Sequence, residues 1–387
     1  MKIIKNPIAL LVLLLLSTAL CFAQDVSKVN EPQTLNELQE SIQKILIETN
    51  TPGAGIALVS EDETILLRGF GKADIENDID VNENTMFRLG SISKLFVGLA
   101  ILKLQEEGKL NLKDKVSDII PDIEIINPWE DQYPIRIENL LEYNSGLSDW
   151  SMAELASNDP KPKTLKESLE FYPKGRVAKF APGTRLQYSN LGVSIAAYIV
   201  ETVSGMRYED YIGKYFFKPM GIEDMTYFNS EQFKKTAAKG YDNGVPLNID
   251  YFHVLYRPSA ALNGSPKDLV NLIRFFIDHG RINNTQIISD SSMLRMERNE
   301  SFDKSISEMF KGYGLTNYVT YYKNFDYRGH GGHVPGYCSD FRYLPEHNMG
   351  YAIMINGEDQ GVIDDLSLLI KAYQTKDLPQ EPIKPRK

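Results

Sequence analysis

Apolar residues recur along the chain with two different periods, which predicts both helices and strands. Residues 32–49 carry one apolar face at helical spacing, which predicts an amphipathic helix. That face consists of Leu35, Leu38, Ile42, Ile45 and Leu46. Residues 53–60 and 64–70 are apolar, β-branched runs on either side of an acidic tripeptide, and this pattern predicts a hairpin.

The next apolar run begins at Ser91 and differs from the first because it is apolar nearly all round. Such a helix is expected to pack inside a large domain. It is expected to end near Gly108, since glycine is common just past the last turn of a helix.

The rest of the chain changes from helical to strand-like patterns near its end. Helical stretches are expected at 189–204 and 266–279, within a long middle segment of about 110–310. Strands are expected at 336–344 and 350–356, followed by a helix at about 361–375.

This order predicts an α+β fold in which N- and C-terminal strands form one antiparallel sheet covered by helices. The middle segment then becomes a large helical insertion. We expect a single domain at 32–376 and a polar tail at 377–387.

Composition and charge exclude some classes of function. Hydrophobic residues make up 42% of the 387 residues, and the formal net charge is −10. Nucleic-acid binding requires clustered lysines and arginines, and no such run occurs, so no nucleic-acid partner is expected.

Residues 1–23 are typical of a cleaved secretion signal. Lys2 and Lys5 precede an apolar run at 8–16, and a small residue, Ala23, follows two positions after Cys21. We therefore expect a periplasmic or secreted protein without a transmembrane anchor once the signal is removed. A lipid on Cys21 is the less favoured alternative, since Leu20 stands where a small residue is expected.

The remaining cysteine, Cys338, lies among apolar and aromatic neighbours. A lone cysteine in such surroundings more often packs in the core than acts as a catalytic thiol. With one cysteine left after signal removal, no intrachain disulfide is expected.

Candidate chemistry begins with a serine three residues before a lysine. The pattern Ser-x-x-Lys occurs at 41/44, 91/94 and 301/304, but only Ser91 opens the buried helix. Residues three apart share a helix face, so Ser91 and Lys94 bring a hydroxyl and an amine together. Free backbone N–H groups at a helix start can serve an oxyanion. A helix N-cap is the alternative role for Ser91.

Two further patterns follow at long spacing. Tyr188-x-Asn190 opens a helical run, and His330-x-Gly332 stands just before a predicted strand, in the segment Gly-His-Gly-Gly-His-Val-Pro-Gly. Other Tyr-x-Asn matches occur, whereas His330-x-Gly332 is the single His-x-Gly of the chain.

Taken in this order, the three motifs resemble those of the penicillin-binding protein and class C β-lactamase family of serine hydrolases. They are separated by about 97 and about 142 residues. The flanking segments agree, and the resemblance covers roughly residues 35–375. These segments are 87–112, 137–147 with Ser145-Gly146-Leu147, and 182–205.

The resemblance implies a role for each residue of the motifs. Ser91 is the acylated nucleophile, Lys94 and Tyr188 share proton transfer, and Asn190 holds the amide of the substrate's acyl side. The backbone N–H groups of Ser91 and His333 form the oxyanion hole.

Physical chemistry adds expectations about these side chains. Burial beside an apolar helix lowers the pKa of Lys94 and makes it a better base. A tyrosine near such a cation gives up its proton more easily, which is expected for Tyr188. Gly332, on an edge strand, lets substrate backbone approach closely.

His330 is a departure, since many β-lactamases of the family have lysine at this position. Histidine is a pH-dependent cation with a reference pKa of about 6.5, so recognition of a β-lactam carboxylate is in doubt. His330 and His333 are also candidate metal ligands, but no cysteine or carboxylate cluster accompanies them. No metal and no cofactor are expected.

The sequence therefore predicts an exported serine hydrolase that cleaves an amide or ester bond through an acyl-enzyme on Ser91. Its substrate is expected to be a small molecule or a peptide. The candidates are an ordinary peptide, a D-amino-acid peptide and a β-lactam. The alternatives are a carboxylesterase of the same fold and a penicillin-binding or sensor module without turnover.

Overall fold

The computed structural model describes residues 31–61, 63–149, 156–157, 159, 161–171, 173–247, 251–298, 300 and 313–379. The predicted signal at 1–23 with Cys21, the 301/304 motif and the last part of the predicted tail lie outside the described residues. Within the described ranges, no helix is both long and apolar enough to cross a membrane.

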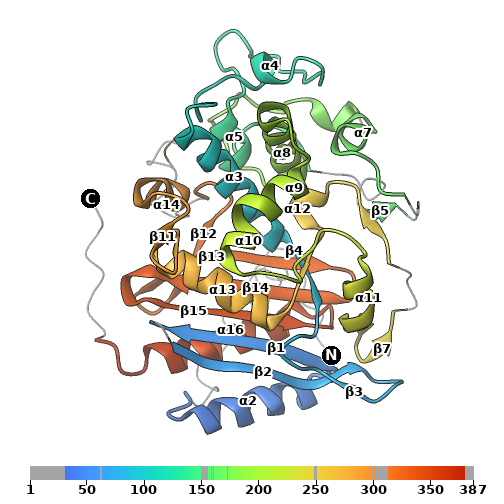
Figure 1. The fold of residues 1–387 in the computed structure, drawn as a ribbon, viewed down its shortest axis with the longest axis vertical. Coiled ribbons are helices and arrows are strands. Elements are labelled where there is room, and N and C mark those ends of the chain that lie inside the picture. Colours follow the sequence, from blue (N-terminus) through green and yellow to red (C-terminus); the bar gives the residue numbers. More distant parts are fainter. Residues whose placement is uncertain are drawn as a thin grey trace, which may run out of the picture.

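One seven-stranded sheet forms the centre of the molecule, and all its neighbouring strands pair antiparallel in the order β12-β13-β14-β15-β1-β2-β3 (Figure 1). Its strands are β1 (Gly53–Ser60), β2 (Glu63–Asp74), β3 (Ile79–Asp80), β12 (Tyr318–Tyr322), β13 (Phe325–Val334), β14 (Tyr337–Leu344) and β15 (Met349–Ile355). Strand β1 pairs with β15 from Ala54↔Ile355 to Ser60↔Met349. The predicted union of N- and C-terminal strands in one sheet is therefore confirmed, as is the β1–β2 hairpin.

The sheet is buried on both faces, which explains why its strands are apolar without strict alternation. In β1, Ile56 and Leu58 pack against the first and last helices of the described chain, in what we call the outer core. The alternate residues Ala57 and Val59 point to the opposite face of the sheet and pack in the inner core. Successive side chains of a strand point to opposite faces, so one strand supplies both cores.

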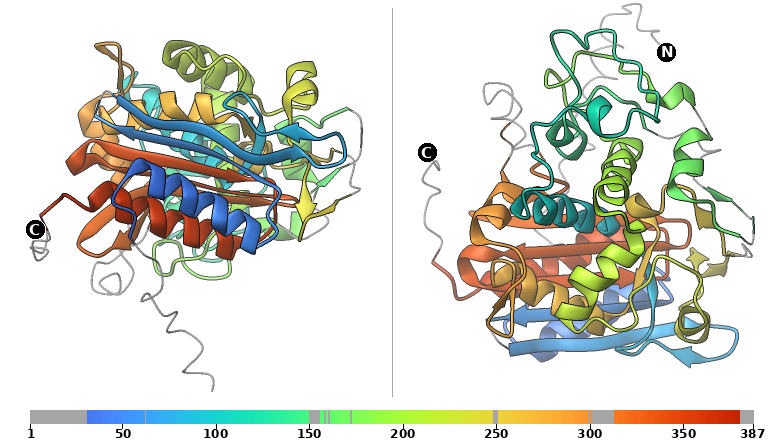
Figure 2. Two further views of the ribbon diagram at one scale, coloured as in Figure 1. Left: turned by 90° about the horizontal axis from the view of Figure 1, so that it is seen from below. Right: turned by 45° about the horizontal axis from the view of Figure 1, so that its top comes forward.

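Helices α2 (Leu35–Glu48) and α16 (Gln360–Thr375) lie side by side on the outer face of the sheet (Figure 2). The predicted helices at 32–49 and 361–375 are thus confirmed. Helix α2 begins with a capping box. The Thr34 hydroxyl accepts from the Glu37 backbone N–H, and the Glu37 carboxylate accepts from the Thr34 backbone N–H.

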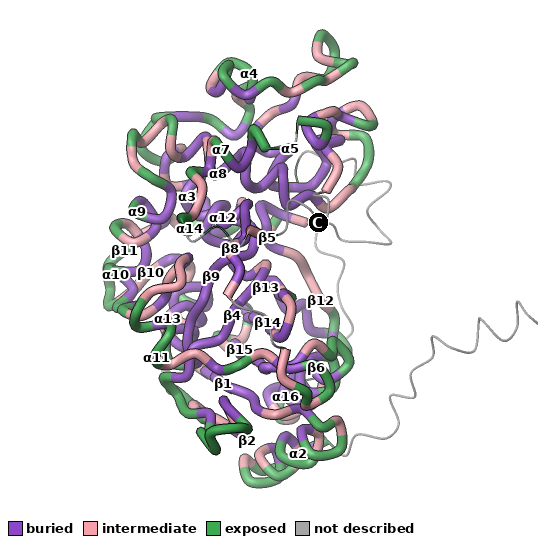
Figure 3. The backbone as a smooth tube through the Cα atoms, turned by 90° about the vertical axis from the view of Figure 1, so that its right-hand side faces the viewer, coloured by how far each residue is buried: buried purple, intermediate pink, exposed green. Residues whose placement is uncertain are grey.

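The inner face is covered by α13 (Pro266–Ile277), with α3 (Lys94–Glu106) and α8 (Asn190–Ser204) in the helical part beyond it (Figure 1). Figure 3 shows the sheet, α3 and α8 as mostly buried, whereas the outer side of α2 is exposed. The apolar helix predicted after Ser91 is present, but it starts with a single 3₁₀ turn, Ser91–Ser93.

Shorter helices and strands complete the chain between β3 and β12. The helices are α4 (Val116–Ile119), α5 (Ile137–Leu141), α7 (Leu165–Glu170), α9 (Tyr208–Ile212), α10 (Lys218–Met220), α11 (Glu231–Thr236), α12 (Arg257–Ala260) and α14 (Asp290–Glu297). Short strands pair as β4 (Phe87–Gly90) with β9 (Leu262–Gly264), β5 (Ala156–Ser157) with β8 (His253–Val254), β6 (Tyr241–Asp242) with β7 (Val245–Pro246), and β10 (Arg281–Ile282) with β11 (Thr285–Gln286). The segment predicted as a helical insertion therefore also contains several two-stranded pairs.

The strand expected at 336–344 is confirmed as β14, which begins just after His330-x-Gly332. The apolar pattern did not predict the preceding strand, β13. The motif lies inside β13. Asp326, Arg328 and the glycines at 329, 331 and 332 interrupt any apolar run there. The strand forms because β14 pairs with it from Arg328 to Val334.

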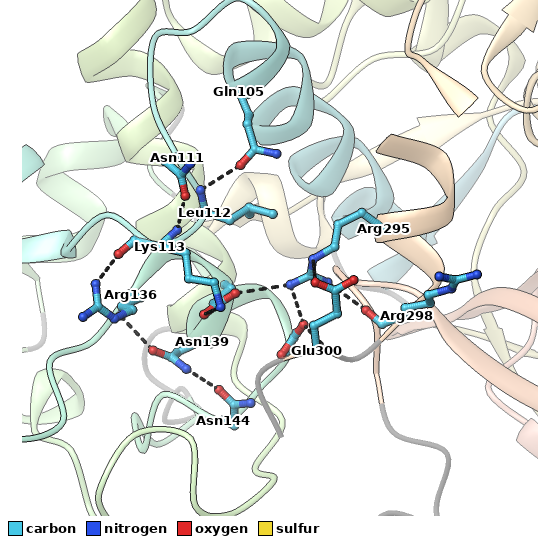
Figure 4. Close-up of polar contacts among 12 residues, drawn as sticks. Gln105, Asn111, Leu112, Lys113, Arg136, Asn139, Asn144, Arg295, Arg298 and Glu300 are labelled. Carbon is cyan, nitrogen blue, oxygen red and sulfur yellow. Dashed lines mark hydrogen bonds and ion pairs between the residues drawn. The ribbon is translucent and has the colours of Figure 1, made fainter. Parts of the chain in front are cut away.

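A polar network connects α5 to α14 and to the loop that follows α5. Arg295 pairs with the buried carboxylates of Glu142 at 2.8 Å and Glu138 at 3.4 Å. Asn139 Nδ2 donates to Asn144 Oδ1 at 2.8 Å (Figure 4). Buried carboxylates need such partners, and the network fixes the backbone that leads into Ser145-Gly146-Leu147.

Candidate active site

Ser91 directly follows β4 at the start of the 3₁₀ turn. The turn requires Gly90, whose φ of 53° is disfavoured for other residues, and a Cβ at Gly90 would lie 2.6 Å from the His333 nitrogen. Neither Ser91 nor Ser93 caps the helix with its side chain. Ser93 Oγ instead donates to the Gly90 carbonyl at 2.6 Å and accepts from the Leu262 N–H at 3.0 Å. The N-cap alternative for Ser91 is therefore wrong, and its hydroxyl is directed to other partners.

Lys94 is the first partner of Ser91. Its Nζ lies 2.8 Å from Ser91 Oγ and donates to the Ser259 carbonyl oxygen at 2.5 Å. Burial holds the pKa of the fully buried Lys94 amine well below its usual range, although Asp149 acts in the opposite direction. A neutral amine at this distance can accept the Ser91 proton.

Tyr188 is the second partner, and its hydroxyl donates to Ser91 Oγ at 3.0 Å. Its ring stacks on Tyr143 with 4.7 Å between centroids, and Lys94 Nζ lies 5.1 Å from the ring centroid. Burial raises the pKa of Tyr188 well above its usual value. The expectation that Tyr188 gives up its proton more easily is therefore wrong, and the side chain acts as a hydrogen-bond donor.

Asn190 is the first residue of α8, two positions after Tyr188. Its backbone N–H and its Nδ2 donate to the same oxygen of Asp149, Oδ1, at 3.0 and 2.8 Å. Its own Oδ1 is buried and has no hydrogen-bond partner among the described residues. Asp149 thus fixes the orientation of the Asn190 amide. The sequence analysis missed Asp149, which follows the Ser145-Gly146-Leu147 segment closely but forms no recognisable pattern with Asn190.

His330 lies in the half of β13 that β12 does not cover, since β12 pairs only as far as Tyr318↔Gly329. The ring is buried, and its Nδ1 donates to the Gly331 carbonyl at 2.6 Å. Burial lowers the pKa of His330 well below the usual value, and Lys94 in its protonated form and Arg342 lower it further. The expectation of a pH-dependent cation is therefore wrong. The neutral ring leaves Nε2 as a buried acceptor without a partner among the described residues.

Gly332 has a different role from the one expected of it. A Cβ at Gly332 would lie 2.0 Å from the Leu89 carbonyl oxygen and 2.6 Å from Ser339 Oγ. The glycine therefore permits the close approach of β4, and not of substrate. It sets the position of the backbone immediately before Ser91.

The backbone N–H of His333 points to the same edge of β13 as those of Gly329 and Gly331. Gly329 N donates to Asn317 Oδ1 and Gly331 N to the Tyr318 hydroxyl, both away from β14. N–H direction alternates along a strand, so the His333 N–H also points away from β14. The close contact of Gly90 with the His333 nitrogen puts this N–H beside the Ser91 turn.

Ser91 opens into a cavity of about 410 Å³. The cavity is lined by Ser91, Tyr188, Tyr313, Tyr318, Thr320, His330, Gly331, Gly332, His333, Asp340, Arg342, Gln360, Ile363, Asp364, Ser367 and Lys371. The fold therefore brings Tyr188 to the hydroxyl that Ser91 shares with Lys94, and it places His330 on the wall of the same cavity. Of the other Ser-x-x-Lys matches, Ser41 lies on α2 at the outer face.

The remaining candidates show no comparable arrangement. Among the described residues, no group of three or more His, Cys, Asp or Glu side chains is arranged to hold a metal ion. Cys338 packs in the outer core, and burial raises the pKa of its thiol to about 12, as suits a packing residue.

Comparison with known proteins gives a consistent result. A family model described as Beta-lactamase matches residues 35–373. A curated relative is Protein flp of Staphylococcus aureus, 29% identical over 248 residues, which are 62% of this chain and 49% of that protein. The chain thus spans about half the length of the curated relatives of that name.

Solved structures of similar fold include two with the same TM-score of 0.73. The octameric penicillin-binding protein homologue from Pyrococcus abyssi is 26% identical, and the match covers 89% of this chain and 79% of that one. The D-amino acid amidase from Ochrobactrum anthropi SV3 is 21% identical, and the match covers 87% and 99%.

Proposed function

The chain belongs to the β-lactamase family, and from this premise we propose that it is a serine hydrolase that cleaves an amide or ester bond through an acyl-enzyme on Ser91. The observation that carries the proposal is that Lys94 Nζ and the Tyr188 hydroxyl both lie within 3.0 Å of Ser91 Oγ. A nucleophile contacted by a neutral base and by a proton donor is the arrangement that acyl transfer needs.

The first half of the reaction forms the acyl-enzyme. Lys94 Nζ takes the proton of Ser91 as Oγ bonds to the substrate carbonyl carbon. The backbone N–H groups of Ser91 and His333 stabilise the negative oxygen of the tetrahedral intermediate. Asn190, oriented by Asp149, binds the amide of the acyl side.

The intermediate then breaks its bond to the leaving nitrogen or oxygen. The proton held by Lys94 returns to the leaving group, with the Tyr188 hydroxyl as a relay at Ser91 Oγ. Water attacks the Ser91 ester in the second half, and Lys94 accepts its proton. Breaking the ester bond releases the acid and returns the proton to Ser91.

The bond cleaved is that of a peptide, a D-amino-acid peptide, a β-lactam or a simple ester. The neutral state of His330 favours the carboxylesterase form as second candidate. At this position the cavity offers an acceptor nitrogen in place of a lysine cation that would pair with a β-lactam carboxylate. A penicillin-binding or sensor module without turnover is the remaining alternative, and the complete set Ser91, Lys94, Tyr188 and Asn190 argues for turnover.

The test is hydrolysis of a panel containing a cephalosporin, a D-amino-acid amide, a D-alanyl dipeptide and a p-nitrophenyl ester. The proposal expects turnover of at least one class by wild type and none by Ser91→Ala. Equal rates in both proteins would refute it. A Ser91 adduct that forms without product would identify the module without turnover.

Export is a further part of the proposal, supported by the pattern of Lys2, Lys5 and the apolar run at 8–16. Mass spectrometry of protein from the cell envelope or medium is expected to give a mature chain that begins at Gln24. A lipid-modified Cys21 at the mature N-terminus would contradict this.

A further inference from the structure

The cavity that contains Ser91 continues around the edge of the sheet to the outer face. Its lining includes Ser91 and His330 at one end and Arg342 of β14 and Lys371 of α16 at the other. Gly331 also lines the cavity, and a Cβ there would lie 3.3 Å from the Tyr318 hydroxyl. The absence of a side chain at Gly331 thus leaves this edge of β13 open.

Arg342 presents an unused donor at the outer end. Its Nε donates to Asp340 Oδ1 at 2.7 Å, and its Nη2 donates to the Tyr318 hydroxyl at 2.5 Å. Its Nη1 is buried and has no partner among the described residues. Only 4% of Arg342 is exposed, and buried donors are rarely left unpaired, so Nη1 requires an acceptor that the described protein does not supply.

Lys371 is a second buried cation on the same wall. Its hydrogen bond is to Thr320 Oγ1 at 3.3 Å, and its Nζ lies 5.4 Å from the Tyr327 ring centroid. Burial lowers the pKa of Lys371 to about 8, and Arg342 also lowers it, whereas Asp340 and Asp364 raise it.

The charges on this wall do not balance. Asp340 is the buried carboxylate, and it is already bonded by Arg342 and by the Tyr351 hydroxyl at 3.0 Å. Asp364 is exposed to solvent. Two buried cations thus face one buried carboxylate, and a bound anion would complete the set.

We propose that Arg342 and Lys371 bind a carboxylate on the leaving group of the substrate. This inference rests on the proposed function. Asn190, assigned to the acyl side, does not line the cavity, and the proposal therefore places the leaving group in it. The preferred substrates are therefore amides or esters whose leaving group carries a negative charge. The cation expected at His330 is replaced by two cations farther along the same cavity.

A matched pair of esters tests the proposal: phenyl acetate and 3-carboxyphenyl acetate, which differ only in the carboxylate on the leaving group. In wild type, kcat/KM is expected to be about tenfold higher for the carboxylated ester, a preference typical of one charge-assisted hydrogen bond. In Lys371→Met this preference should fall severalfold, because only Arg342 then remains to bind the carboxylate. Lys376→Met, which removes a lysine just beyond α16 that does not line the cavity, serves as control and should keep the preference.

The pH dependence gives a second, independent signature. The preference of wild type should decline as the pH rises through about 8, where Lys371 loses its proton. Lys371→Arg keeps its charge and should retain the preference up to higher pH. A wild-type preference that does not change with pH, or one that Lys371→Met retains, would overturn the proposal.

Binding of the product separates this inference from the proposed function. Calorimetry with Ser91→Ala should show that 3-hydroxybenzoate binds about tenfold more tightly than phenol, and that adding Lys371→Met reduces the difference severalfold. If both esters are hydrolysed equally and both products bind equally, the carboxylate site is wrong and the hydrolase stands. If neither ester reacts but the difference in binding holds, the site stands and the proposed function fails.

Discussion

Lys94 Nζ lies 2.8 Å from Ser91 Oγ, and one turn of chain between them sets this distance. The same nitrogen is held by the Ser259 carbonyl, so the amine has little freedom to turn away. Because burial lowers the pKa of Lys94, its neutral form is easier to reach, and in that form a lone pair can face the hydroxyl that it must deprotonate.

The first prediction concerns the charge of Lys94. Arginine at this position keeps a permanent cation beside Ser91, so Lys94→Arg should lower kcat by about 10²- to 10⁴-fold. In wild type, kcat/KM for a neutral ester should rise with pH as Lys94 loses its proton, with a midpoint well below 10.5. The pH–rate profile checks this, and a Lys94→Arg enzyme with the wild-type profile would exclude Lys94 as the base.

The second prediction separates Tyr188 from Lys94. Tyr188 keeps its proton, so Tyr188→Phe should lower kcat by about 10²-fold through loss of the hydrogen bond to Ser91, without moving the ascending limb of the profile. The phenylalanine ring preserves the stack on Tyr143, and circular dichroism should show an unchanged fold. The double variant with Lys94→Ala should lose far less than the product of the two effects, because both groups serve one hydroxyl. If the ascending limb of the pH–rate profile disappeared in Tyr188→Phe, Tyr188 would instead be the base.

Two adjacent glycines provide a matched pair for the role of β13. A Cβ at Gly332 would lie 2.0 Å from the Leu89 carbonyl oxygen, so Gly332→Ala should destabilise the fold by about 2 kcal/mol or more. A Cβ at Gly331 meets its nearest atom at 3.3 Å, so Gly331→Ala should cost well under half of that. Urea unfolding of the two variants measures the difference. Equal free energies of unfolding for the two variants would show that β4 does not pack closely against Gly332.

His330 should stay neutral throughout the physiological range. Its folded pKa lies well below 6.5, so the unfolded chain binds the proton as the pH falls through 6.5 while the folded chain does not. His330 therefore lowers the stability of the fold as the pH drops below about 6.5. NMR of the ring, assigned with His330→Gln, should show no titration between about pH 6 and pH 8. Titration near 6.5 would restore the cation expected from sequence.

The parts of this structure that were predictable from sequence are those that depend on short-range patterns. The helices at 35–48 and 360–375 follow from apolar spacing, and the Ser91–Lys94 pair follows from the spacing of three residues along one turn. The union of β1 with β15 followed from placing apolar strands at both ends of one domain.

The features that the sequence did not predict depend on long-range packing. Strand β13 exists because β14 pairs with it, although its glycines and charges break the apolar pattern. Asp149 orients Asn190 across 41 residues of chain. The neutral state of His330 follows from its burial near Lys94 and Arg342, which no local motif describes.

The most direct test of the central claim is the site of covalent labelling by a fluorophosphonate, read by intact mass and peptide mapping. We expect one adduct per chain on Ser91, none in Ser91→Ala, and a labelling rate in wild type that rises with pH as Lys94 becomes neutral. Labelling of another serine, or a rate in Lys94→Arg equal to that of wild type, would contradict the assignment of Ser91 as a nucleophile activated by Lys94.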